Sequence, residues 1–413
     1  MLQLWFIANS LLWPFNIEIS GLRLGLNVIL LTLVGAVWIG KRWINNDISV
    51  AKYSVKVLVG FFIFLTFSYL VAINGTCTDK FQKFILTAPV LFFLIFVGLE
   101  VGWRATDNDW LKLQKAAPWI LLVAFAGFIV EMLYPAGFPY QAGYRYQGKL
   151  SGLFSEPSAV AFSLFPSIAV LLVAESKKLR RTGMLALFFL LILSRSSTLI
   201  ALAVCWFLYY QVLHGSIGRS VRYVIGGTIV LVLLAMTNYD FLMAPTVDRF
   251  AGVLAGHDET NNISSLVYLQ GWQDAWSNLQ RTNGLGLGFN MMGCNPLPVS
   301  VARDILDKSF RIELNSEDGS VIFGKLVSEA GVIGVIFFIS ITWWWIRLEN
   351  EIHRRRGVAS TFVVRIQTAL IFSFVASSLV RSSGYFSGGL LLMVVAIVAG
   401  VKWRRDHIVR ITE

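Results

Sequence analysis

Residues 183–213 read GMLALFFLLILSRSSTLIALAVCWFLYYQVL, an apolar run that only Ser194-Arg195-Ser196-Ser197 interrupts. As one helix the run would be ~46 Å long, which exceeds the ~30 Å hydrocarbon core of a bilayer. Both flanks are basic, which places them on the same side of a membrane and requires an even number of crossings. We therefore expect a broken hairpin, with a short first helix of ~18 Å over 183–194. Arg195 would then lie at the floor of an outward-facing cavity, or it would simply reach water from a helix end.

The composition indicates that the same class of structure extends along the whole chain. Of its 413 residues 56% are hydrophobic and only 14% are charged, and the mean hydropathy is +0.66. A soluble domain carries about a quarter of charged residues. We predict an all-α, polytopic transmembrane helix bundle of about 12 spans. The expected spans are 2–15, 23–40, 55–73, 85–102, 117–134, 157–174, 183–194, 197–213, 223–239, 325–346, 362–380 and 384–401.

Lysine and arginine collect in the short segments that this count of spans places on one face, such as 177–181 and 402–410. Basic loops mark the cytoplasmic side of membrane proteins, so both termini are expected there. The net charge of +11 is explained by these loops, and nucleic acid is therefore not an expected partner. The chain then divides into three parts. These are residues 1–239, with transmembrane spans, an outward loop at 135–156 and the broken hairpin at 183–213; a large outward loop at 240–322; and C-terminal spans with a cytoplasmic tail at 323–413.

The loop at 240–322 is the longest polar interruption, and loops of this length are usually functional. It contains an amphipathic helical piece at 264–280, in which the apolar stripe favours a structural role. The glycine-rich stretch NGLGLGFNMMG at 283–293 lacks a preceding strand and a following Lys-Ser or Lys-Thr, so it is not a nucleotide phosphate loop. A charged run at 311–320 follows. Lys325, which opens the next span, is interpreted as an interfacial anchor.

The outward loop at 135–156 combines glycine and proline with tyrosine rings and basic groups. Aromatic rings stack on sugars and cations bind phosphate, so this mixture suits a phosphorylated glycan, although tyrosines also form interfacial belts. Glu156 precedes Pro157, where an acid is favoured by the helix dipole, so a capping role is the alternative to a chemical one. The expected substrate-binding residues of this loop are Tyr144, Arg145, Tyr146 and Lys149.

Metal and thiol chemistry have little support in the sequence. Of the four histidines only His257 is expected outside, so no metal site and no cofactor are predicted. Cys77 and Cys294 both fall outside, where a disulfide is permitted, whereas Cys205 lies within a span.

Four patches in this order resemble the superfamily of O-antigen polymerases (Wzy type) and O-antigen ligases. They are GLFSEPSAVAFSL, LILSRSSTLIAL, SSLVYLQGWQDAWSNLQRTNGLGLGF and DGSVIFGKLVSEAGVIGVIFF, and they lie within 143–338. The resemblance implies a metal-independent glycosyltransferase at the outer face of a bacterial inner membrane, acting on undecaprenyl-diphosphate-linked glycans. A chain-length regulator protein and a flippase would be further partners. Residues that match the outward-facing groups of the family by position are Arg145, Glu156, Arg195, Arg249 and Arg281.

One departure from the family pattern bears on which activity is expected. Where the ligases carry a His-Asn pair, this chain has Glu317-Asp318-Gly319, which favours a polymerase over a ligase. A diphosphate leaving group needs fixed cations, and Arg381 is a further candidate because it follows the penultimate span. The attacking hydroxyl needs a carboxylate base, for which Glu156 and Glu317 are the candidates, with Asp318 as an orienting partner. A secondary transporter or flippase remains the alternative of a different class, although no internal repeat is visible.

Overall fold

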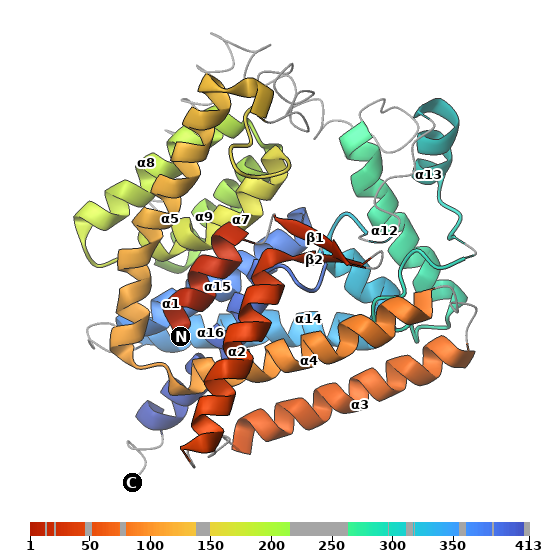
Figure 1. Cartoon of the computed structure of the whole chain (residues 1–413), viewed down its shortest axis with the longest axis horizontal. Coiled ribbons are helices and arrows are strands. Elements are labelled where there is room, and N and C mark those ends of the chain that lie inside the picture. Colours follow the sequence, from red (N-terminus) through yellow and green to blue (C-terminus); the bar gives the residue numbers. More distant parts are fainter. Residues whose placement is uncertain are drawn as a thin grey trace.

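The computed structural model is predominantly helical (Figure 1). It describes residues 1–12, 15–19, 22–45, 52–74, 80–137, 149–214, 263–295, 297–310, 317, 319–354, 361–381 and 384–408. Within these ranges the departure from the expected all-α class is one antiparallel hairpin, in which β1 (Asn16–Ile19) pairs with β2 (Leu22–Gly25).

The apolar runs of the sequence become helices throughout the described part of the chain. Among the described residues, six helices are long and apolar enough to cross a membrane, namely α2, α3, α4, α5, α14 and α15. The membrane class is therefore supported, whereas the expected count of about 12 spans is not confirmed, and the span at 223–239 lies outside the described residues. The helices are α1 (Leu2–Ile7), η1 (Ala8–Leu12), α2 (Leu26–Ile44), α3 (Lys52–Asn74), α4 (Phe81–Arg104), α5 (Asp107–Leu133), η3 (Pro135–Gly137), α7 (Pro157–Leu172), α8 (Lys177–Ser194), α9 (Ser197–His214), α12 (Ile263–Arg281), α13 (Val301–Ile305), η6 (Leu306–Phe310), α14 (Ile322–Arg354), α15 (Thr361–Val380) and α16 (Gly388–Ile408).

Helix α7 lies at the centre of one part of the bundle. All of its residues are buried, because its sequence PSAVAFSLFPSIAVLL is apolar or small on every face. It packs against α5, α8, α9 and α15. In Figure 1, α3 and α4 lie side by side along another part of the body, and α12 with α13 projects from it next to α14. The position of α7 fixes that of the candidate residue Glu156, which directly precedes its first residue.

Contacts between helix ends show that the helices run in alternating directions. At one end, which we call the Glu156 end, the contacts are Glu156 with Arg381, Tyr268 with Leu379, Asn27 with Phe386, Leu150 with Leu193, and Glu317 with Lys80 and Lys83. At the opposite end, the Arg42 end, they are Arg42 and Arg104 with Glu100, Lys402 with Ala105, and Arg405 with the Trp103 ring. The two ends separate the segments that the charge pattern assigns to opposite faces.

The apolar run at 183–213 folds back where the sequence predicts. Helix α8 ends at Ser194, Arg195 adopts a left-handed backbone (φ 44°, ψ 37°), and α9 begins at Ser197. The prediction of a short first helix is wrong, because the basic residues 177–181 join α8 and give it 18 residues, or ~27 Å. The apolar part of α8 is still residues 183–194, because residues 177–181 are basic, and α8 is not among the described helices that are long and apolar enough to cross a membrane.

Candidate functional site

Glu156 and Arg381, which are 225 residues apart in the chain, meet at the Glu156 end. One guanidinium nitrogen of Arg381 lies 3.4 Å from each carboxylate oxygen, and the Ser158 hydroxyl donates a hydrogen bond to the same carboxylate. The two charged side chains keep 29% and 17% of their surface exposed. This is a reachable carboxylate beside a fixed cation.

The capping interpretation of Glu156 does not describe its side chain. The residue occupies the N-cap position of α7 with an extended backbone (φ −150°, ψ 158°), and its carbonyl accepts from the Ala159 amide at 3.0 Å. Its carboxylate makes no hydrogen bond to an amide of the described first turn of α7. The acid is therefore directed toward Arg381 rather than toward the helix that it precedes.

A second glutamate fixes the segment that leads to Glu156. Glu131 in α5 is fully buried, and its Oε2 accepts from the amides of Ser151 (3.0 Å) and Gly152 (2.7 Å). Gly152 has a φ of 58°, a left-handed conformation that favours glycine. Sequence reasoning missed Glu131, although a carboxylate inside an apolar span is a recognised sign of a functional or structural polar contact.

Glu317 belongs to a separate, cation-rich group, which we call the lysine cluster (Lys80, Lys83, Lys325, Glu317 and Glu329). The two carboxylate oxygens of Glu317 bind Lys80 Nζ at 2.6 Å and Lys83 Nζ at 2.7 Å. Partial burial would raise the pKa of the Glu317 carboxyl, but the hydrogen bonds from the two lysines outweigh this and lower it from 4.5 to about 2. A carboxylate of so low a pKa is a weak base near neutral pH. Of the two expected bases, Glu156 therefore fits the role better.

The sequence suggested that Lys325 is an interfacial anchor. The structure contradicts this, because the Lys325 side chain is only 2% exposed. Its ammonium group donates to the Glu317 carbonyl at 2.7 Å and lies 3.8 Å from Glu329 Oε1. Glu329 is also buried and accepts from the amides of Asn290 (2.7 Å) and Met292 (2.9 Å). A buried ion pair thus joins the start of α14 to the glycine-rich stretch.

The glycine-rich stretch at 283–293, to which the sequence assigned no role, packs into a break in α14. At Gly331 the helix has a non-helical backbone (φ 58°, ψ −138°). The Val332 amide donates to the Gly284 carbonyl at 2.9 Å, and the Leu287 amide donates to the Ser328 carbonyl at 2.9 Å. A Cβ on Gly331 would lie 2.0 Å from the Gly284 oxygen. Close approach of two backbones explains why glycine is required here.

Arg281 ends α12 away from the Glu156–Arg381 pair. Its guanidinium lies 3.8 Å from Cys294 Sγ, and Cys294 is disulfide-bonded. Cys205 is a free thiol, as expected for a residue within a helix, and Cys77 lies outside the described residues. Elsewhere on α12, Asp274 forms an ion pair with Arg303 of α13.

The remaining expected site residues are divided between two neighbouring segments and the residues that the structure does not describe. Lys149 precedes Leu150, whose amide donates to the Leu193 carbonyl at 3.0 Å, so Lys149 and Arg195 lie on adjoining segments at the Glu156 end. Both are partly buried. Tyr144, Arg145, Tyr146, Arg249 and Asp318 lie outside the described residues. Within the described ranges, no group of three or more His, Cys, Asp or Glu side chains is arranged to hold a metal ion.

No protein-family model matches the chain. No curated protein matches it either.

Proposed function

We propose that the protein is an integral membrane glycosyltransferase that polymerises lipid-linked oligosaccharide repeat units of a surface polysaccharide such as O-antigen. The observation that carries this proposal is the Glu156–Arg381 pair, since it combines a reachable carboxylate with a guanidinium at one end of a helical bundle. Transfer of a glycan from a lipid diphosphate needs one group of each kind.

In the proposed reaction, Glu156 accepts the proton of a sugar hydroxyl on one lipid-linked repeat. The hydroxyl oxygen forms the new glycosidic bond to the anomeric carbon of a second repeat. The bond from that carbon to the undecaprenyl diphosphate breaks, and its electron pair leaves with the diphosphate. Arg381 stabilises the developing negative charge, with Arg195 and Lys149 on the adjoining segments, and the reaction consumes no cofactor.

The proposed location is the outer face of a bacterial inner membrane, with both chain termini in the cytoplasm. Two observations support this orientation. Basic residues such as Arg42 and Arg405 gather at the end opposite to Glu156, as cytoplasmic ends do. Cys294, which contacts Arg281 within the expected outward loop at 240–322, is disulfide-bonded. Disulfides persist in oxidising compartments outside the cytoplasm.

A secondary transporter is the second candidate, and a specific feature favours it. Helix α14 is broken at Gly331 beside the buried Lys325–Glu329 pair, and broken helices with buried charges often form transport sites. A ligase that transfers finished polymer to a lipid A-core acceptor is the closest enzymatic alternative.

Deletion of the gene followed by gel analysis of the surface glycan separates these functions. Loss of a polymerase leaves single repeat units attached to the lipid A-core, whereas loss of a ligase leaves no attached repeats. Loss of a flippase or transporter traps the lipid-linked intermediates on the cytoplasmic side. Complementation with Glu156→Gln then tests whether the deciding residue belongs to the reaction.

A further inference from the structure

An elongated apolar cavity of about 740 Å³ lies between α3, α4, α14 and α16. Its volume falls within the range of ligand sites, roughly 300–1,000 Å³. Along α16 its lining extends from Leu390 to Val401, which corresponds to ~17 Å of helix axis. The lining is therefore long enough to hold an extended chain.

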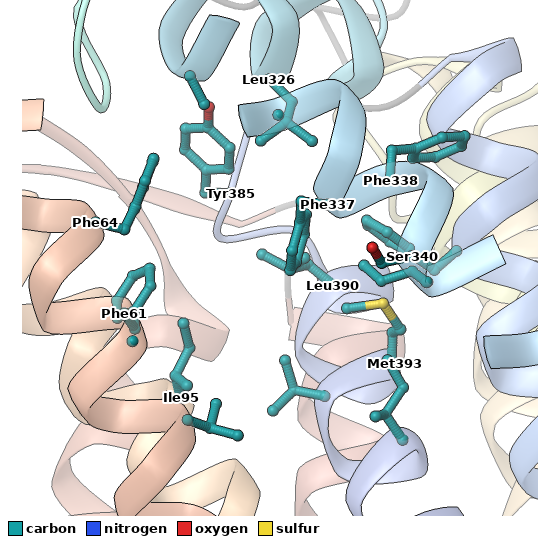
Figure 2. A pocket seen from close by; sticks show the side chains of 18 of the residues that line it. Phe61, Phe64, Ile95, Leu326, Phe337, Phe338, Ser340, Tyr385, Leu390 and Met393 are labelled. Carbon is teal, nitrogen blue, oxygen red and sulfur yellow. The ribbon is translucent and has the colours of Figure 1, made fainter. Parts of the chain in front are cut away.

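The lining is almost entirely hydrocarbon and aromatic ring. Figure 2 shows Phe61, Phe64 and Ile95 on one side of the space, with Phe337 and Met393 on the other. Among the described lining residues, polar side-chain atoms come from Ser340, Trp344 and Tyr385 alone. The Ser340 hydroxyl already donates to the Ile336 carbonyl at 2.7 Å. A polar ligand would find few partners here, so the occupant must be apolar along its length.

One end of the cavity connects to the lysine cluster. Tyr385 lines that end, with its hydroxyl turned away from the space (Figure 2) and hydrogen-bonded to Glu329. The Lys325 ammonium lies 5.6 Å from the centre of the Tyr385 ring and donates to the Glu317 carbonyl. From there Glu317 binds the two lysines at the start of α4. An amphiphile with an apolar chain and an anionic head would find a complement for each part at this end. Another cation, Arg404, lies 5.7 Å from the centre of the ring of Trp344, which also lines the cavity, but Arg404 belongs to the Arg42 end, which the proposed function places in the cytoplasm.

We propose that the cavity binds the polyisoprenyl chain of an anionic lipid, with its phosphate at the lysine cluster beyond Tyr385. This inference rests on the proposed function, which supplies a polyisoprenyl diphosphate as substrate and so selects this lipid over a phospholipid. It assigns α3 and α4, which carry none of the residues that the sequence analysis singled out for the site, to substrate binding. It also gives Lys83 a role in holding the phosphate of the acceptor lipid, because the leaving diphosphate of the donor is assigned to Arg381.

Photolabelling of the purified full-length protein in nanodiscs tests the assignment. The probe is a polyisoprenyl phosphate with a diazirine in its chain, and labelled peptides are identified by mass spectrometry. Labels are expected on α3, α4, α14 and α16, with unlabelled polyisoprenyl phosphate competing and phosphatidylglycerol not competing. Equal competition by phosphatidylglycerol, or labels confined to other helices, would overturn the proposal.

A matched pair of glycines provides the structural control. Gly60 lines the cavity on α3, and a Cβ built on it meets no described atom within 4 Å, so Gly60→Trp fills space without displacing the backbone. Gly40 on α2 has equally open surroundings but does not line the cavity. We expect Gly60→Trp to reduce labelling at least about tenfold and Gly40→Trp to leave it unchanged. Unchanged labelling in both variants contradicts the assignment.

The head-group part of the proposal has its own test. Lys83→Gln should weaken labelling by the polyisoprenyl phosphate by about tenfold, because a charge-assisted bond is lost, yet it should not alter labelling by the neutral polyisoprenol. Equal effects on both lipids would remove the phosphate from the lysine cluster. These labelling measurements require no polymerisation. If the cavity is labelled specifically but deletion of the gene leaves polymer length unchanged, only the proposed function is disproved. Normal polymerisation with no label in the cavity would disprove the cavity assignment alone.

Discussion

The substitution Glu156→Gln separates a catalytic base from a structural acid at the start of α7. Glutamine keeps the shape of the side chain and can still accept from the Ser158 hydroxyl and from Arg381. It cannot accept the proton of a sugar hydroxyl. The structure makes the change informative, because the Glu156 side chain does not cap the described first turn of α7. No helix cap is therefore lost together with the carboxylate.

The two roles predict effects of different size. The Glu156–Arg381 pair is partly exposed and its atoms are 3.4 Å apart, so its loss should lower the free energy of unfolding by no more than ~1 kcal/mol. Loss of a general base typically reduces the rate by about 10²–10⁴-fold. At 1.36 kcal/mol for each factor of ten, this raises the activation barrier by roughly 2.7–5.4 kcal/mol. Even the smaller of these values exceeds the expected change in stability.

The assay measures polymer length in a deletion strain that expresses each variant, together with the amount of protein in the membrane. Glu175→Gln is the matched control, since Glu175 is exposed in the turn that follows the opposite end of α7. We expect Glu156→Gln to insert normally and make no polymer, and Glu175→Gln to behave as the unchanged protein. Polymer of near-normal length from Glu156→Gln at normal protein levels would refute the assignment of the base.

Two further predictions concern the region around α14. The lowered pKa of Glu317 implies that its ion pairs contribute stability in full above its unfolded pKa near 4.5, and that this contribution is lost as the pH falls toward about 2. Between pH 6 and 3, thermal unfolding should therefore show a smaller loss of stability in Glu317→Gln than in the unchanged protein. Salt should reduce this difference, because the Glu317 side chain is 43% exposed. Equal acid sensitivity of the two proteins would contradict this prediction. Gly331→Ala should destabilise the protein by at least ~2 kcal/mol, because a Cβ would lie 2.0 Å from the Gly284 oxygen at a positive φ, while Gly40→Ala serves as the tolerated control. Detergent-solubilised protein that melts at the same temperature in both alanine variants would show that the break in α14 is not required.

Much of the helical framework could be predicted from the sequence, because a membrane span is a local property of composition and length. Runs of about 20 apolar residues must satisfy their backbone groups internally, so they form helices wherever they occur. The fold-back at 194–197 was equally local, since a polar interruption between two basic flanks leaves a hairpin as the solution. Sequence failed on the length of α8, because the basic residues 177–181 were taken as a loop although lysine and arginine are good helix formers.

The candidate site was decided mostly by tertiary structure. The sequence selected Glu156 and Arg381 separately, but no local pattern relates residues 225 positions apart, and only the packing of α7 against α15 brings them together. Lys325 was taken for an anchor because its place at a span boundary is typical of one. Its burial depends on Glu317 and on Glu329, which in turn binds the glycine-rich stretch. Charges can be buried only where partners from other segments converge on them, and such convergence is a property of the folded chain rather than of any stretch of its sequence.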